Sequence, residues 1–116
     1  MSLTQKEIVE ACKPLLENVH VHETQRSRKR CWITAYQLWV LLKAMLHPIC
    51  DKLIDDCGGD YVGEGAGSNV GPAQKIGQAL GNDPDIETEY LNTRYFMIDG
   101  NKPSDQDCGL FRIKKL

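Results

Sequence analysis

The sequence lacks both a long apolar run and a secretory leader. Its longest apolar stretch, Leu38 to Met45, is interrupted by Lys43, whereas a membrane span needs about 20 consecutive apolar residues. The first residues are polar and acidic instead of basic and then apolar, so they do not resemble a signal peptide. We therefore expect a cytoplasmic protein with no membrane partner.

A strong charge of either sign is also missing. The chain holds 14 Lys and Arg against 16 Asp and Glu, a formal net charge of −2 over 116 residues. This balance gives no overall attraction to nucleic acid or to an anionic membrane. The length and the 41% of hydrophobic residues fit one compact core. We predict a single domain over residues 1–116.

The cysteines lack the close spacing of a metal site. There are five of them, an odd number without a secretory context, so we expect reduced thiols and no disulfide framework. His47, Cys50 and Cys57 invite a zinc interpretation, but structural zinc sites use close Cys-x-x-Cys pairs, which are absent. Cys50 and Cys57 share one helix face at a spacing of seven, so core packing explains them. We expect no metal.

Motifs for catalysis and nucleotide binding are missing as well. The chain has no G-x-S-x-G and no H-E-x-x-H, and its glycine-rich stretch lacks the Gly-Lys-Ser/Thr of a P-loop. That stretch also follows a predicted helix, whereas a dinucleotide fingerprint follows a strand. We expect a noncatalytic protein without a cofactor. A small enzyme or nucleotide binder that uses the glycine loop is the third alternative.

What the sequence does contain is a sharp break at residues 58–71. Six glycines fall in this stretch, and such a density excludes a regular helix or strand. Pro72 suits the first position of a helix, which we predict to run to Leu80, where Gly81 and Asn82 end it.

The residues before the break are predicted to be mainly helical. Apolar residues repeat with helical spacing from Thr4 to Val19, and Thr4 with Glu7 forms a capping box, although Pro14 predicts a kink or a stop. Thr34 and Gln37 open a second helix that reaches Leu46 with apolar residues nearly all round, so we expect it to be the most buried. A third helical face spans residues 49–57, and residues 31–33 form a short strand.

A basic cluster precedes that second helix. Residues 20–30 show no apolar periodicity and contain Arg26, Arg28, Lys29 and Arg30, so we predict a loop or a frayed segment. A solvated linker is one interpretation of the charges. The other is a patch that contacts phosphate, because arginine offers a rigid fork of donors to phosphate oxygens.

The residues after Gly81 predict two strands. Residues 86–98 are rich in Tyr, Thr, Phe and Ile with alternating polarity, residues 99–106 are typical of a turn, and residues 110–116 alternate again. The two strands can pair as an antiparallel hairpin.

This order of elements resembles the winged-helix arrangement, in which a helix-turn-helix precedes a β-hairpin wing. The predicted fold class is therefore α+β and winged-helix-like, with three or four helices followed by a C-terminal antiparallel hairpin. The resemblance implies that the helix from Pro72 to Leu80 is the recognition helix and that residues 99–108 form the wing. The long glycine loop and the acidic wing tip depart from that pattern.

The resemblance implies a small regulatory domain that binds double-stranded DNA. Glutamine and lysine suit base edges and phosphates, and the expected nucleic-acid-binding residues are Gln74, Lys75, Gln78, Ser68, Asn69, Arg26, Arg28, Lys29, Arg30 and Lys102. The alternative is a protein-protein interaction module or homodimer on the same scaffold without DNA binding, which the acidic C-terminal half and an exposed aromatic strand favour.

Overall fold

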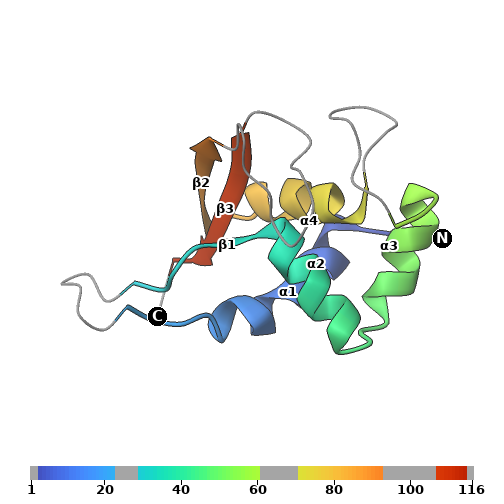
Figure 1. The fold of residues 1–116 in the computed structure, drawn as a ribbon, viewed down its shortest axis with the longest axis horizontal. Coiled ribbons are helices and arrows are strands. Elements are labelled where there is room, and N and C mark those ends of the chain that lie inside the picture. Colours follow the sequence, from blue (N-terminus) through green and yellow to red (C-terminus); the bar gives the residue numbers. More distant parts are fainter. Residues whose placement is uncertain (1–2, 23–28, 61–70, 93–106, 115–116) are drawn as a thin grey trace.

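The computed structural model describes residues 3–22, 29–60, 71–92 and 107–114 (Figure 1). Within these ranges the chain forms four helices and three strands. In chain order they are α1 (Gln5–Glu17), β1 (Ile33–Thr34), α2 (Ala35–Ala44), α3 (Ile49–Cys57), α4 (Pro72–Gly81), β2 (Ile86–Asn92) and β3 (Asp107–Ile113).

The predicted hairpin is present and belongs to a three-stranded antiparallel sheet. The strand order is β1-β3-β2, so β3 is central. Pairing of β2 with β3 runs without interruption from Ile86 opposite Ile113 to Asn92 opposite Asp107. The fold is therefore α+β, as expected. β3 begins three residues earlier than predicted, and residues 93–98 of the other predicted strand lie outside the described residues.

Both predicted capping boxes are confirmed. The backbone N–H of Glu7 donates to Oγ1 of Thr4 at 3.2 Å, and Glu7 Oε2 accepts from the N–H of Thr4 at 3.0 Å. Thr34 and Gln37 exchange the same two bonds at 3.1 and 2.9 Å. Each box satisfies two of the free donors at a helix start, which explains why α1 and α2 begin where they do.

Of the two alternatives predicted at Pro14, a kink or a stop, the stop does not occur. α1 continues through this residue to Glu17. Pro14 itself is exposed, whereas Cys12 and Leu16 on the opposite face are fully buried. The apolar face of α1 packs into the core, and tertiary packing of this kind outweighs a local loss of helix propensity.

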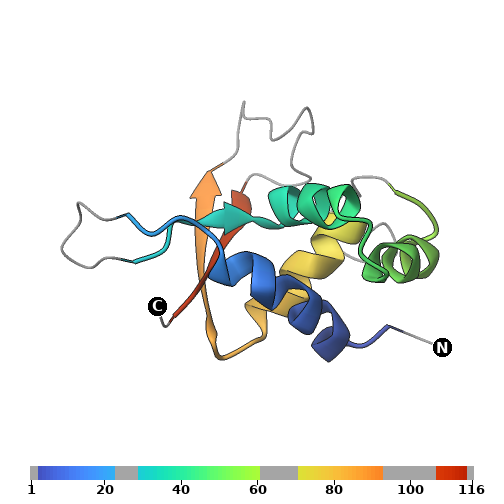
Figure 2. The same cartoon turned by 90° about the horizontal axis from the view of Figure 1, so that it is seen from below.

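The core is organised around α4, which contacts the other three helices, β2 and β3. Figure 2 shows α4 (yellow) between α1 (blue) and α2 (teal). Ile76 and Leu80 have no exposed surface. We expected the helix from Thr34 to be the most buried, but α2 leaves Val40 39% and Leu41 42% exposed. No helix in the described ranges combines the length and the apolar composition that crossing a membrane requires.

The packing of α4 allows a direct test at Gly77. A Cβ atom there would lie 3.7 Å from Cβ of Ala35 and 3.7 Å from the ring of Phe111, which is ordinary contact. Alanine is favoured over glycine in a helix interior by about 1 kcal/mol. We therefore expect Gly77→Ala to raise the free energy of unfolding by up to about 1 kcal/mol in urea denaturation. Gly77→Val, which adds further atoms against the same neighbours, should destabilise the fold.

Candidate functional site

Of the three residues expected to read DNA from α4, Gln74 and Lys75 contact other residues of the protein. Oε1 of Gln74 accepts a hydrogen bond from the N–H of Gly71 at 2.6 Å and so caps the start of α4. Lys75 Nζ lies 3.4 Å from Oδ2 of Asp56 on α3. Of the three, Gln78 alone is classed as exposed; the other two are half-buried. The structure therefore brings an acidic residue against the lysine that was expected to contact nucleic acid.

Lys75 and Gln78 line a cleft of about 180 Å³ between α4, α3 and the start of α1. Leu3 and Ile8 supply apolar surface, and Asp56 supplies a carboxylate. Because the positive and negative charges of the cleft form one ion pair, the cleft has no excess positive charge to attract phosphate.

The residues at the two ends of the predicted loop pair with each other, and we call this segment the arm. Val21 and Arg30 form an antiparallel bridge, and the N–H of Cys31 donates to the carbonyl of His20 at 2.8 Å. The stems of the arm, residues 20–22 and 29–31, extend away from the helices (Figures 1 and 2). Arg26 and Arg28 lie between these stems and outside the described residues.

The two described cations of the arm, Lys29 and Arg30, each contact another part of the protein. Lys29 Nζ lies 3.9 Å from Oε1 of Glu87. Nη1 of Arg30 donates to the carbonyl of Val19 at 3.0 Å, and its Nε is buried without a hydrogen-bond partner among the described residues. Arg30 therefore holds the arm to the end of α1. The other expected contact residues, Ser68, Asn69 and Lys102, lie outside the described residues.

A second group of charges covers the outer face of the sheet. The guanidinium of Arg112 donates to Glu87 through a short hydrogen bond and stacks 3.9 Å from the ring centre of Trp32. The hydrogen bond from Arg112 holds the pKa of Glu87 below its ordinary value. Arg112 lies on the predicted hairpin, but its charge is already balanced.

Four exposed apolar residues lie in the second half of α2 and in the two residues after it. Val40, Leu41, Met45 and Leu46 are 39%, 42%, 55% and 87% exposed, and we call them the corner patch. Leu41 and Met45 share one face of the helix at a spacing of four. Exposed apolar side chains that form one contiguous patch are typical of a surface that binds another protein.

Leu46 has an unusual backbone conformation. Its φ is +53°, in the left-handed region where a residue other than glycine costs roughly 1–2 kcal/mol. Its N–H donates to the carbonyl of Lys43 at 3.1 Å, and the N–H of His47 donates to that of Leu42 at 3.1 Å. These two bonds form a Schellman motif, whose left-handed position is usually glycine. The chain therefore holds a strained leucine in solvent.

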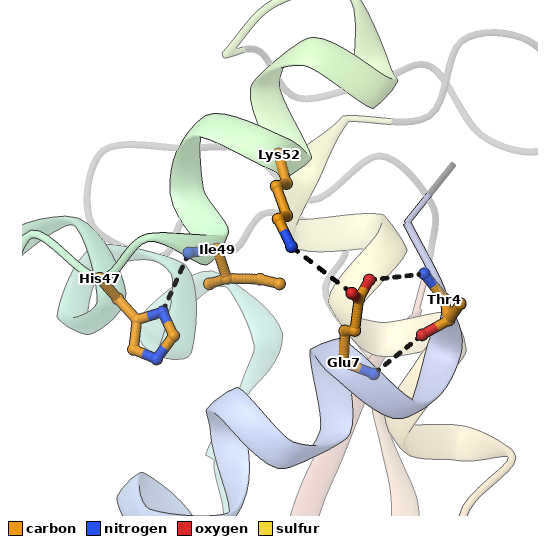
Figure 3. Close-up of polar contacts among 5 residues, drawn as sticks. All are labelled: Thr4, Glu7, His47, Ile49 and Lys52. Atoms are coloured by element: carbon orange, nitrogen blue, oxygen red, sulfur yellow. Dashed lines mark hydrogen bonds and ion pairs between the residues drawn. The ribbon is translucent and has the colours of Figure 1, made fainter. Parts of the chain in front are cut away.

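Polar contacts hold the start of α3 in place and join α3 to α1 (Figure 3). Nδ1 of His47 accepts from the N–H of Ile49 at 3.0 Å and so satisfies one donor at the start of α3. Lys52 Nζ lies 3.4 Å from Oε1 of Glu7, which joins α3 to α1. The backbone hydrogen bond from Thr4 is the main reason that the pKa of Glu7 is lowered.

Asp60 fixes the residues after α3 to α2. Its Oδ1 accepts from the indole Nε1 of Trp39 at 2.9 Å and its Oδ2 from Nζ of Lys43 at 3.0 Å. Lys43 also lies 5.0 Å from the centre of the Trp39 ring. Burial alone would raise the pKa of Asp60, but the hydrogen bonds from Trp39 and Lys43 outweigh it and lower the pKa.

Four of the described cysteines have thiol pKa values above the ordinary range. Burial raises the pKa of the Cys12 thiol to about 12, and it also raises the pKa values of Cys50, Cys57 and Cys108. Thiols of this kind stay protonated at neutral pH and are poor nucleophiles. Within the described ranges, His, Cys, Asp and Glu side chains do not form a group of three or more that could hold a metal ion.

Sequence reasoning missed the corner patch. The available signal was the second predicted helix, whose apolar residues run nearly all round the cylinder. We assigned all of that surface to the core, whereas a ten-residue helix at the side of a small core buries only part of its circumference. The remaining apolar residues form the exposed patch.

Comparison with known proteins gives no family: no family model matches the sequence, and neither the curated proteins nor the solved structures searched yielded a match.

The contacts of Asp60 predict an acid-sensitive contribution to stability. Its lowered pKa means that this contribution is fully present above the ordinary pKa of aspartate, about 4, and is lost as the pH falls through the folded-state value. We expect Asp60→Ala to cost about 1 kcal/mol at pH 7, because it leaves the Trp39 indole without its acceptor. The cost should shrink towards pH 3.

Urea denaturation followed by tryptophan fluorescence at the two pH values measures this difference. Asp55→Ala, which removes an exposed carboxylate from the same helix region, is the matched control and should show little cost at either pH. A cost for Asp60→Ala that is independent of pH would contradict the role given to the ionised carboxylate.

Proposed function

We propose that this chain is a noncatalytic protein-interaction module on a winged-helix-like scaffold and that the corner patch binds its partner. The order of elements supports the scaffold, because α1, β1, α2 and α4 precede the hairpin and β1 lies beside it in the sheet. A fold of this kind does not by itself decide between nucleic acid and protein as the ligand.

The observation that carries the proposal is the conformation of Leu46. A left-handed leucine that is 87% exposed gains almost no burial to offset its backbone strain. Strain that persists at the surface is typical of a residue with a role in binding. Met45 and Leu41 extend the same apolar surface along α2, so a partner would bury three large side chains together.

The charges around α4 also favour a protein over a nucleic acid. Affinity for a duplex depends on cations that can neutralise phosphates. Lys75 and Lys29 are instead paired with Asp56 and Glu87. An interface that relies on apolar side chains does not need a positive surface.

The variant Leu46→Gly should change the stability of the fold and the strength of partner binding in opposite directions. Glycine adopts the left-handed region without strain, so we expect this variant to raise the free energy of unfolding by roughly 1 kcal/mol. It should also weaken the proposed interaction, because it removes the most exposed side chain of the corner patch. Leu46→Asn, which also tolerates this conformation but is polar, is the matched control and should lose binding too.

Site-specific cross-linking in the native host measures the binding. A photoreactive benzoylphenylalanine at position 41 should give a discrete protein adduct that disappears when Leu46 is replaced by glycine. The same group at Glu17, an exposed residue of α1, should not give that adduct. An adduct that persists in Leu46→Gly, or no discrete adduct at position 41, would overturn the proposal.

Nucleic-acid binding through the arm is the second candidate function. The specific observation in its favour is that the paired stems, residues 20–22 and 29–31, project from the body (Figure 1), and the sequence places Arg26 and Arg28 in the segment that joins them. Arginine side chains there would contact the phosphate backbone without reading sequence.

A labelled DNA duplex tests this second candidate. We expect binding at low salt that weakens steeply as salt rises, because phosphate contacts release counterions. Arg28→Ala should weaken it, whereas Lys75→Ala should have little effect because Lys75 already pairs with Asp56. No binding at low salt, or equal binding by Arg28→Ala, would eliminate this candidate.

A further inference from the structure

The two edges of the sheet differ in how they are protected. β1 at one edge is only two residues long, and a short edge strand offers little for another chain to pair with. β2 at the other edge is seven residues long, and its continuous register contains no bulge. Its sequence, IETEYLN, contains neither the lysine nor the proline that commonly protects an edge.

The second half of β2 is open to solvent on both faces. Residues 89–92 are all exposed, with Tyr90 at 69% and Leu91 at 38%. Tyr90 lies opposite Gly109 of β3, which offers no side chain to cover the tyrosine ring. Figure 1 shows β2 as the outermost strand, beside β3. Among the described strands none pairs with the outer edge of β2, so this edge offers backbone groups and an exposed aromatic side chain together.

The charge of this edge indicates what could pair with it. Acidic residues alternate along the segment that leads into β2 and continues through it: Asp83, Asp85, Glu87 and Glu89. Lys13 pairs with Asp85, and Arg112 and Lys29 pair with Glu87. Glu89 is exposed and has no ion pair among the described residues. Cross-strand pairs of opposite charge stabilise a sheet, and pairs of like charge destabilise it.

We propose that the outer edge of β2 binds an extended protein segment by β-sheet pairing, with a Lys or Arg of that segment opposite Glu89 and an apolar or aromatic residue beside Tyr90. Backbone hydrogen bonds supply the affinity, and the two side-chain positions supply the selectivity. The inference is independent of the corner patch, because the two surfaces share no residue.

A second copy of β2 fits this edge less well than a basic segment. Pairing two copies antiparallel would bring Glu87 and Glu89 of both chains onto one face of the joined sheet. Like charges on neighbouring strands oppose pairing. A basic segment instead places its cations on that face, opposite the glutamates.

A synthetic peptide provides the test. The probe is an acetylated and amidated peptide of alternating lysine and valine, about eight residues long to match a strand. We expect saturable binding to the full chain in fluorescence anisotropy. Chemical shifts of the backbone amides should change mainly within residues 87–92, because pairing occurs at that edge. An alternating glutamate and valine peptide should not bind.

Two controls separate sheet pairing from simple charge attraction. A version of the peptide that is N-methylated at every residue keeps its charges but cannot donate backbone hydrogen bonds, so it should lose binding. Glu89→Lys should weaken binding of the lysine peptide about tenfold and create affinity for the glutamate peptide. Asp55→Lys makes the same charge change on α3, away from β2, and should leave the peptide affinity nearly unchanged.

Three results would overturn the proposal. The first is that the lysine peptide fails to bind, and the second is that the N-methylated peptide binds equally well, which would indicate charge attraction alone. The third is a dimer of the pure chain in sedimentation that is lost in Tyr90→Lys, since that result would assign the edge to a second copy.

Discussion

The rest of the structure depends on the burial of α4. Ile76 and Leu80 have no exposed surface, and Ala73 and Ala79 are nearly as buried. Because α4 contacts the other three helices and both long strands, these elements are arranged around it. A helix that packs on several sides has little free surface for a ligand. This constraint, more than the chemical type of its glutamines and lysine, decides how α4 can contribute to binding.

Ion pairs at the surface change the electrostatic potential of the protein more than they change its free energy of unfolding. An exposed pair contributes at most about 1 kcal/mol, so pairs such as Lys75 with Asp56 add little to the fold. Their effect is that Lys29 and Lys75, two of the cations expected to face phosphate, are neutralised by nearby acids. Against this balanced background, the exposed apolar side chains of the corner patch and of β2 are the features that distinguish one part of the described surface from another.

The sequence predicted the parts of the structure that local rules determine. The capping boxes at Thr4 and Thr34 and the helix start at Pro72 each depend on residues within one turn of helix, and the hairpin depends on local alternation. The sequence did not predict the contacts of Lys75 with Asp56 or of Trp39 with Asp60, because these join residues that are distant along the chain. It also missed the left-handed Leu46, since helix-end rules expect glycine or asparagine there.

Leu46 and the outer edge of β2 share one physical property. At each of them the residues present are not those that best suit the isolated domain. Leu46 is strained where glycine would be relaxed, and β2 lacks the lysine or proline that would block pairing at its edge. Departures from local rules of this kind concentrate at functional sites, because a partner can compensate for them. The strand β2 and the C-terminal end of α2 lie apart in both views (Figures 1 and 2). Taken together, the two proposals describe a domain that would bind two protein segments at separate surfaces.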